Sequence, residues 1–390
     1  MIQRDSSLYN IPFLILCVSY ALFGASFNMI IPELPSYLAS LGGEDYKGLI
    51  ISLFTLTAGI SRPISGKLAD TIGRVPVMIS GTIVCVFCSL LYPILAGVTG
   101  FLMLRLLHGF STGFTPTAIT AYIADIVPDD RRGEAMGIVG VSMNLGASAS
   151  PPIGSYLVLA YSLDILFYVS SFIAFLSMVL LLRMKETLTQ KEKFHPRQLM
   201  LKRNEIIDKK TIVPAIICGL TYFGLGVILT IVADQCEFMG IKNKGLFFTS
   251  FTICSVMSRL VAGQISDRYG RIEVIVISIF CLVCSYIFMA MATTPVLLLS
   301  ATGCIGFSLG IAAPALFAWT IDRSDASRRG MAMGTMYIGL EAAIGLGALL
   351  SAGIYANNPA NFDVVFYVTA GITSTAFYFL IREYSVRQDL

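Results

Sequence analysis

Long apolar runs recur along nearly the whole chain of 390 residues, and each run ends at Gly, Pro or charged residues. A run of about 20 apolar residues is the length that an α-helix needs to cross the hydrocarbon core of a bilayer. Only 13% of the residues are charged, whereas a soluble domain has about 25%. This composition excludes a soluble globular protein and predicts an all-α membrane protein. We predict twelve transmembrane helices, at residues 10–32, 47–67, 75–95, 98–124, 133–158, 163–183, 211–233, 245–266, 272–292, 295–321, 331–355 and 363–382.

Positive charges are concentrated in the loops on one side of these predicted helices. Because the number of spans is even, both termini lie on that side as well. Short loops rich in Lys and Arg stay in the cytoplasm, so we predict cytoplasmic N- and C-termini in the cell inner (plasma) membrane. The positive residues on this side are Lys67, Arg74, Arg131, Arg132, Arg268, Arg271, Arg323, Arg328 and Arg329. The opposite loops contain only Lys47, Lys242 and Lys244.

The longest hydrophilic stretch lies at the midpoint of the chain. From Arg183 to Lys210 it contains nine Lys and Arg residues and four acidic residues. We therefore predict an N-terminal six-helix bundle at residues 1–183, a basic cytoplasmic linker at 184–210 and a C-terminal six-helix bundle at 211–390. We interpret the linker charge as an orientation signal, and the alternative is that it binds a partner or acidic lipid headgroups.

The two predicted halves repeat one another at a fixed spacing of 197 residues. Residues 61–74 match residues 258–271, with Ser-Arg, Gly, Asp and Gly-Arg at equivalent positions. The same spacing pairs Gly109 with Gly306, Asp125 with Asp322, and Arg131-Arg132-Gly133 with Arg328-Arg329-Gly330. Since the spacing contains six spans, both halves have the same membrane orientation. Parallel repeats of this kind are related by an axis along the membrane normal.

Three motifs resemble signatures of the major facilitator superfamily. Residues 66–74, with their copy at 263–271, resemble the loop motif that follows the second and eighth spans. Residues 105–109 resemble the fourth-span motif, with His108 in place of the usual Gln, and residues 146–155 resemble the antiporter motif of exporting subgroups. The resemblance implies two six-helix bundles around a central cavity that opens to one side at a time. It points to the drug:proton antiporter (multidrug efflux) subgroup with twelve spans.

Opposite charges meet at the predicted tight turn between the second and third spans. Gly73 permits a turn with positive φ, and Asp70 and Arg74 flank it. A carboxylate is stabilised by the amides at a helix N-terminus, so we expect Asp70 to cap the third span or a helix of the other half. The resemblance implies that such contacts close the cytoplasmic side, and the alternative is that they only set topology. The predicted gating residues are Asp70, Gly73, Arg74, Asp125, Arg131 and the copies Asp267, Gly270 and Arg271.

Few ionisable residues lie inside the predicted spans, and each is costly to place in lipid. Arg105 has a threonine as its repeat partner, so the asymmetry argues against a purely architectural role. Glu341 lies near the middle of the eleventh span, where a carboxyl group can exchange protons; a packing role is the alternative. A neutral, bonded histidine is the alternative for His108, and contact with interfacial water is the alternative for Glu33 and Asp234. The predicted substrate and proton-coupling residues are Arg105, Glu341, His108, Asn28, Asn144, Glu33 and Asp234.

Small residues and prolines interrupt the fifth predicted span. Gly146, Pro151 and Gly154 match the antiporter motif, whereas Ser150 and Ser155 stand where that motif has glycines. Small residues let helices approach closely, and paired prolines bend a span and free backbone carbonyls. We expect this span to pack against a helix of the other half. The partial match favours export over import.

Together these features predict a secondary active transporter that works by alternating access, and not an enzyme. We predict proton-coupled efflux of an amphipathic or hydrophobic small molecule. The alternative is a proton-coupled importer of a sugar, carboxylate or peptide, and the alternative of another class is a non-transporting membrane receptor or scaffold. The expected partners are the small-molecule substrate, protons and membrane lipid, without nucleic acid. We expect a monomer.

The nine cysteines do not predict a metal centre. Two CxxC pairs, Cys85–Cys88 and Cys281–Cys284, invite that reading. The resemblance places their spans away from the cavity, and we expect no His or carboxylate ligand beside them. The sequence also has no phosphate-binding loop. We therefore predict neither a metal nor a cofactor.

Overall fold

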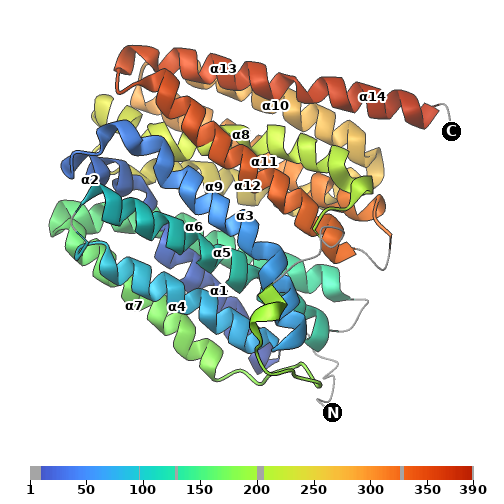
Figure 1. Cartoon of the computed structure of the whole chain (residues 1–390). Helices are drawn as coiled ribbons and strands as arrows, with labels where there is room; N and C mark the ends of the chain where they lie inside the picture. Colours follow the sequence, from blue (N-terminus) through green and yellow to red (C-terminus); the bar gives the residue numbers. More distant parts are fainter. Residues whose placement is uncertain (1–9, 96, 128–130, 200–205, 326–328, 389–390) are drawn as a thin grey trace. The chain divides into compact units, whose positions relative to one another are not determined.

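The computed structural model describes residues 10–95, 97–127, 131–199, 206–325 and 329–388, and all regular structure in these ranges is helical (Figure 1). The all-α prediction is therefore confirmed for the described residues. The α-helices are α1 Ile11–Asn28, α2 Leu34–Ser40, α3 Lys47–Thr71, α4 Arg74–Leu91, α5 Val98–Ile126, α6 Arg132–Ala160, α7 Leu163–Leu182, α8 Ile212–Phe238, α9 Gly245–Tyr269, α10 Arg271–Ala290, α11 Pro295–Asp322, α12 Arg329–Tyr355, α13 Phe362–Ser374 and α14 Ala376–Gln388.

Ten helical segments among the described residues are long and apolar enough to cross a membrane. Their lengths of 18 to 30 residues suit the hydrocarbon thickness of a bilayer. Helices α5 and α6 have 29 residues each and coincide with the spans predicted at 98–124 and 133–158, but they are not among the ten. Both carry many small and polar residues, including Arg105 and His108 on α5.

Helix packing divides the chain into two compact units. Unit 1 comprises Met1–Leu34 and Leu56–Lys202, and unit 2 comprises Pro35–Thr55 and Arg203–Leu390. The division passes through α3, so the first turns of this helix belong to unit 2 and the later turns to unit 1. Unit 2 thus includes a segment of the bundle that the sequence predicts at residues 1–183.

In unit 1, helix α1 packs against α6 and α7, and α4 packs against α5 and α7. Helix α1 begins where the Asn10 side chain accepts a hydrogen bond from Phe13 N at 3.0 Å, with a proline in the first turn. Both features favour a helix start. The core between these helices holds Phe13, Leu16, Met78 and Tyr122, each at most 2% exposed.

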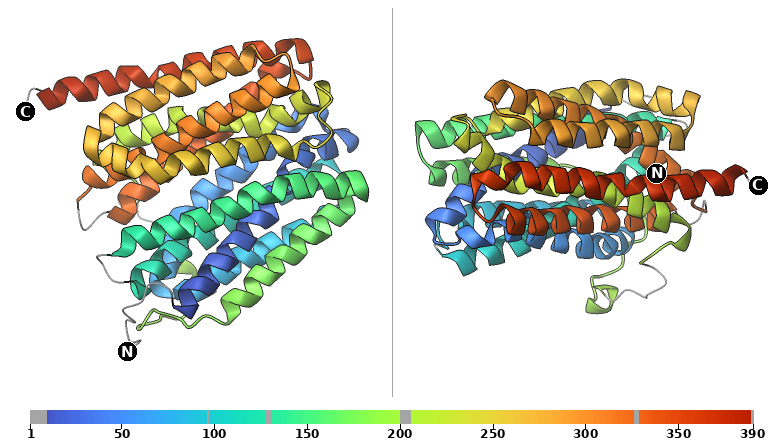
Figure 2. Two further views of the ribbon diagram at one scale, coloured as in Figure 1. Left: turned by 180° about the vertical axis from the view of Figure 1, so that it is seen from behind. Right: turned by 90° about the horizontal axis from the view of Figure 1, so that it is seen from above.

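In unit 2, helix α8 packs against α12, and α11 packs against α9 and α10. Helices α13 and α14 follow one another end to end, and α10 lies beside them (Figure 2). Val227, Leu282, Tyr286 and Phe366 form part of the core of this unit. The packing of α8 on α12 brings Asp234, near the end of α8, and Tyr355, at the end of α12, to the same end of this unit.

Candidate functional site

Arg74 joins two carboxylates at the turn between α3 and α4 in unit 1. Its Nη1 lies 2.9 Å from Asp70 Oδ1, and its Nε donates a hydrogen bond to Asp125 Oδ2 on α5 at 3.1 Å. Gly73 has a φ of 126°, which residues with a side chain rarely adopt. The Arg74 side chain is 12% exposed and that of Asp125 is 31% exposed, so water screens this pair incompletely, whereas the Asp70 side chain is 71% exposed. The structure thus brings four of the predicted gating residues together.

The repeat in unit 2 has the same arrangement. Arg271 Nη1 lies 2.5 Å from Asp267 Oδ1, and Arg271 Nε lies 3.4 Å from Asp322 Oδ2 on α11. Gly270 has a φ of 99°. The Arg271 side chain is 27% exposed, against 12% for Arg74, so water screens the second cluster more strongly.

Glu186, at the start of the predicted linker, caps helix α4. Its Oε1 accepts a hydrogen bond from Arg74 N and its Oε2 accepts one from Val75 N, both at 3.0 Å. Oε1 also accepts hydrogen bonds from the backbone N–H groups of the next two residues at 2.9 Å. A carboxylate at this position satisfies free backbone donors and interacts favourably with the helix dipole. The cap that we expected Asp70 to provide for the third span is therefore supplied by Glu186, because the Asp70 side chain lies against Arg74 instead.

The structure describes the remaining charges of the predicted cytoplasmic side only in part. Arg131 directly precedes α6 and is half-buried. The side chain of Arg132 lies outside the described residues, as do Arg328 and the part of the predicted linker at 200–205.

A chain of polar side chains runs through the interior of unit 1. Arg105 Nη1 donates a hydrogen bond to Tyr92 Oη at 3.4 Å, and Tyr92 Oη lies 3.2 Å from His108 Nδ1. His108 Nε2 lies 3.3 Å from Cys85 Sγ, which in turn lies 3.2 Å from Ser26 Oγ. Arg105, His108 and Cys85 are at most 1% exposed. Arg105 and His108 are therefore connected through Tyr92, a residue that the sequence motifs do not indicate.

The contact between His108 and Cys85 corrects one expectation. We expected no histidine beside the CxxC pairs, but the packing of α4 on α5 brings His108 to Cys85 from 23 residues away. Within the described ranges, no group of three or more His, Cys, Asp and Glu side chains is arranged to hold a metal ion. Cys281 and Cys284 are exposed on α10.

Helices α1 and α6 approach backbone to backbone at two glycines of the antiporter-type segment. A Cβ added to Gly146 would lie 1.9 Å from Ala21 O, and one added to Gly154 would lie 2.1 Å from Met29 O. Only glycine fits without a shift of one helix. Pro151 lies inside α6 between these contacts. The expected packing of this segment on the other half is thus corrected for both glycines, which pack on α1 of the same unit.

Three further predicted residues of unit 1 have defined partners. Glu33 is 6% exposed and its Oε1 accepts a hydrogen bond from Ser155 Oγ at 2.6 Å. Asn28 and Asn144 donate side-chain hydrogen bonds of 2.8 and 2.9 Å to carbonyl oxygens one turn earlier in their own helices. Glu33 is thus shielded from water and hydrogen-bonded.

Glu341 lies on α12 in unit 2 and is 7% exposed. The surrounding turns pack closely on α8, since a Cβ added to Gly339 would lie 2.6 Å from Ala215 O. The structure therefore places this carboxyl group away from water within one of the ten apolar helical segments.

Asp234, at the end of α8, forms a buried ion pair within unit 2. Its Oδ2 accepts a hydrogen bond from Lys47 Nζ at 2.5 Å, and the two side chains are 11% and 9% exposed. Lys47 Nζ also lies 3.8 Å from Glu44 Oε1 and 5.9 Å from the centre of the Tyr355 ring. The pattern of loop charges indicates Lys47 only as one of three external positive residues, and its partner becomes visible only in the structure.

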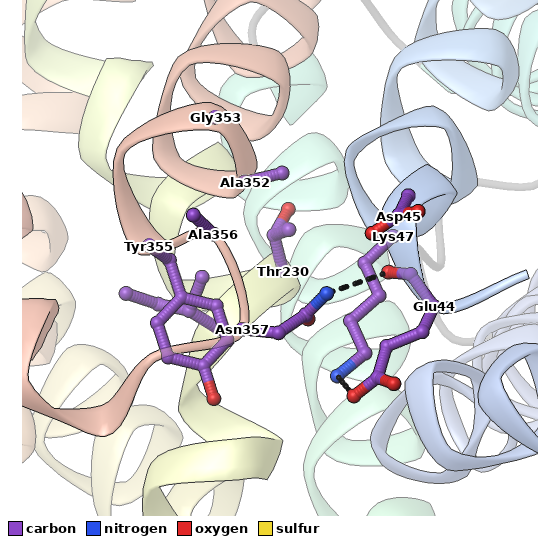
Figure 3. Close-up of a pocket in the computed structure, with 10 residues that line it drawn as sticks. Glu44, Asp45, Lys47, Thr230, Ala352, Gly353, Tyr355, Ala356 and Asn357 are labelled. Carbon is purple, nitrogen blue, oxygen red and sulfur yellow. Dashed lines mark hydrogen bonds and ion pairs between the residues drawn. The ribbon is translucent and has the colours of Figure 1, made fainter.

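A pocket of about 190 Å³ lies beside this ion pair (Figure 3). Its lining includes Glu44, Asp45, Lys47, Thr230, Tyr355 and Asn357, whereas Asp234 is not a lining residue. Asn357 Nδ2 donates a hydrogen bond to Glu44 O at 3.4 Å, which ties the turn after α12 to the segment before α3. The pocket therefore combines carboxylate, ammonium and aromatic groups from three parts of unit 2.

Comparison with known proteins identifies related sequences over most of the chain. The sequence model of the Major Facilitator Superfamily matches residues 16–243 and 216–389. The multidrug resistance protein MdtG of Serratia proteamaculans is 32% identical over 313 residues, which cover 76% of this chain and 74% of the relative. The multi-drug resistance efflux pump PmrA homolog of Lactococcus lactis is 28% identical over 315 residues, 75% of each chain.

Solved transporter structures share the fold at lower identity. A peptide transporter POT in complex with sulfate has a TM-score of 0.80 at 14% identity and matches 97% of this chain and 95% of that chain. A D-xylose-proton symporter has a TM-score of 0.77 at 14% identity, with 94% and 96% coverage. At these identities the similarity establishes the fold alone.

Proposed function

The chain belongs to the Major Facilitator Superfamily and is a multi-pass transporter of the plasma membrane, and from this premise we propose that it exports amphipathic or hydrophobic small molecules in exchange for protons. The proposal includes alternating access, in which a central cavity opens to one side of the membrane at a time. Two relatives with names that denote multidrug resistance or efflux support export. The partial antiporter motif supports the same direction.

The proposed architecture has twelve spans, with bundles at residues 1–183 and 211–390 joined by the linker 184–210. The ten apolar segments, together with the long helices α5 and α6, support this number. The excess of Lys and Arg in the loops on one side supports cytoplasmic termini. In this proposal the protein acts as a monomer.

The observation that carries the alternating-access proposal is the repeated Arg–Asp–Asp cluster. Arg74 ties the turn between α3 and α4 to α5, and Arg271 ties the turn between α9 and α10 to α11. Each cluster holds three helix ends together, so that the end of a bundle can move as one body. At the predicted cytoplasmic side, the two clusters and Arg131 would stabilise the closed arrangement.

Glu341 is the proposed proton-coupling acid. Its burial within an apolar segment supports this role, because an ionisable side chain inside a membrane span is costly to place there and by default marks a functional site. Arg105, His108 and the polar chain around them would orient a polar or anionic group of the substrate. Asn28, Asn144, Glu33 and Asp234 complete the proposed set.

Import of a sugar, carboxylate or peptide is the second candidate, because the structural neighbours include a peptide transporter and a xylose-proton symporter. The direction of proton coupling separates the two functions. Proteoliposomes with an acidic interior should accumulate ethidium through proton exchange, and collapse of the gradient by nigericin should release the dye. Accumulation only with an alkaline interior, or of xylose or a dipeptide instead of ethidium, would favour import. Protein-free liposomes provide the control.

A further inference from the structure

The pocket in unit 2 has the chemistry of an ammonium-binding site. Lys47 Nζ contacts the Asp234 carboxylate at 2.5 Å, lies 3.8 Å from a Glu44 oxygen and 5.9 Å from the Tyr355 ring centre. Carboxylates attract an ammonium ion by charge and hydrogen bonding, and an aromatic face attracts it through its quadrupole. Two carboxylates and one aromatic ring therefore lie around one cationic nitrogen.

The carboxylates at this site carry more negative charge than one lysine neutralises. Glu44 and Asp45 line the pocket and Asp234 pairs with Lys47 at its edge, so three carboxylates lie at this site and one lysine does. The nearby Glu237 has its own partner, because Lys244 Nζ lies 2.7 Å from Glu237 Oε2. The pocket thus carries a surplus of negative charge, which favours an additional cation.

The pocket also has room for a small organic ion. Its volume of about 190 Å³ equals the space of roughly six water molecules in the liquid. The side chains of Ala352 and Tyr355 contribute apolar surface, and Thr230 contributes a hydroxyl group (Figure 3). The alkyl groups of an organic ammonium ion would contact this surface.

Close helix packing, and not side-chain reach alone, places Lys47 at this position. A Cβ added to the next residue, Gly48, would lie 2.9 Å from Ala348 O and 2.9 Å from Ala352 Cβ on α12. Two turns further along α3, Thr55 also lies close to α12, because a Cβ added to Gly345 of α12 would lie 2.8 Å from Thr55 Oγ1. The first turns of α3 therefore lie directly on α12, and this packing holds Lys47 beside Asp234.

We propose that Asp234, Glu44 and Tyr355 form a binding site for organic ammonium cations, which Lys47 fills in this structure as a tethered competitor. A free cation cannot share the Asp234 oxygen at the same time, because Lys47 Nζ already contacts it at 2.5 Å. Cation binding and the packing of Lys47 on Asp234 exclude one another. This inference rests on the proposed function, because it places one contact of a cationic substrate at the predicted external end.

Binding of tetraethylammonium to the purified full-length protein tests the site without any transport. The Lys47→Ala variant vacates the site, so its dissociation constant in isothermal titration calorimetry should be about tenfold or more below that of the unchanged protein. The double variant Lys47→Ala/Asp234→Asn should lose this gain. Sodium chloride keeps the ionic strength equal in all titrations.

Lys244→Ala is the matched control, because it also removes an ammonium group from a carboxylate, but from one whose side chain is 68% exposed. It should leave tetraethylammonium binding unchanged. Equal affinity of the Lys47→Ala and unchanged proteins would overturn the proposal, as would an equal gain in Lys244→Ala or a gain that persists without Asp234.

A second variant covers the case in which Lys47→Ala does not fold. Lys47→Gln keeps a neutral hydrogen-bond donor beside Asp234, and it should bind tetraethylammonium more tightly than the unchanged protein but less tightly than a vacated site. No gain in a folded Lys47→Gln protein would overturn the proposal. Gain in binding without ethidium export would refute the proposed function alone, whereas export without any gain would refute this site alone.

Discussion

Arg74 Nε donates a hydrogen bond to Asp125 Oδ2 at 3.1 Å across 51 residues of sequence. The counterpart residues Arg271 and Asp322 are also 51 residues apart, and their atoms lie 3.4 Å from one another. The internal repeat of the sequence is therefore a repeat of ion-pair geometry. The two pairs differ in exposure, because Asp125 is 31% exposed and Asp322 is 56% exposed.

The more shielded pair should contribute more to stability. A double-mutant cycle with Arg74→Ala and Asp125→Ala should give a coupling energy of about 1 kcal/mol, since water screens this pair only partly. The cycle with Arg271→Ala and Asp322→Ala should give roughly half of that value or less. Denaturant unfolding of the purified protein measures both. A larger coupling energy for the unit 2 pair would contradict this assignment.

Loss of the Glu186 cap should destabilise unit 1. Glu186→Ala removes an acceptor from the N-terminus of α4 and should lower the free energy of unfolding by about 1–2 kcal/mol. Glu186→Gln should lose less, because its amide oxygen still accepts a hydrogen bond. Lys193→Ala, an exposed change in the same linker, provides the control. Thermal unfolding that is the same for Glu186→Ala and Lys193→Ala would exclude the capping role.

Local features of this site are predictable from sequence, but its long-range partners are not. Gly73 and Arg74 are adjacent and Asp70 lies one turn earlier, so short-range spacing places them at one turn. Glu186 reaches Arg74 across 112 residues, and Asp234 reaches Lys47 across 187 residues. Such contacts depend on how whole helices pack, which hydropathy and charge patterns do not specify.

The same limit explains the antiporter-type segment. Its small residues and prolines indicate a close helix contact, and the close contact is present. The pattern contains no information about the partner, which for Gly146 and Gly154 is α1 of the same unit. The all-helical class is predictable because apolar runs of spanning length leave few alternatives in a bilayer.

The seam between α1 and α6 should not tolerate a side chain. Gly146→Ala would place a Cβ 1.9 Å from Ala21 O, and the required helix shift should cost about 2–3 kcal/mol. Gly140→Ala on the same helix is the matched control, since its added Cβ would meet no heavy atom within 4 Å apart from its chain neighbours and the nearby backbone of its own helix. That control should be neutral or stabilising by about 0.5–1 kcal/mol. The yield of folded protein and its melting temperature measure the difference, and equal values for the two variants would refute the close contact.

Proton movement during substrate exchange tests the coupled-efflux proposal most directly. Proteoliposomes that contain the pH dye pyranine receive ethidium outside, without an imposed gradient. Exchange predicts that the interior becomes alkaline as ethidium enters, because protons leave. Glu341→Gln should abolish the pH change, and Asp363→Asn, at an exposed position on α13, should retain it. Ethidium entry without a pH change in the unchanged protein, or with acidification of the interior, would contradict proton exchange; a full pH change in Glu341→Gln would remove Glu341 from the coupling role.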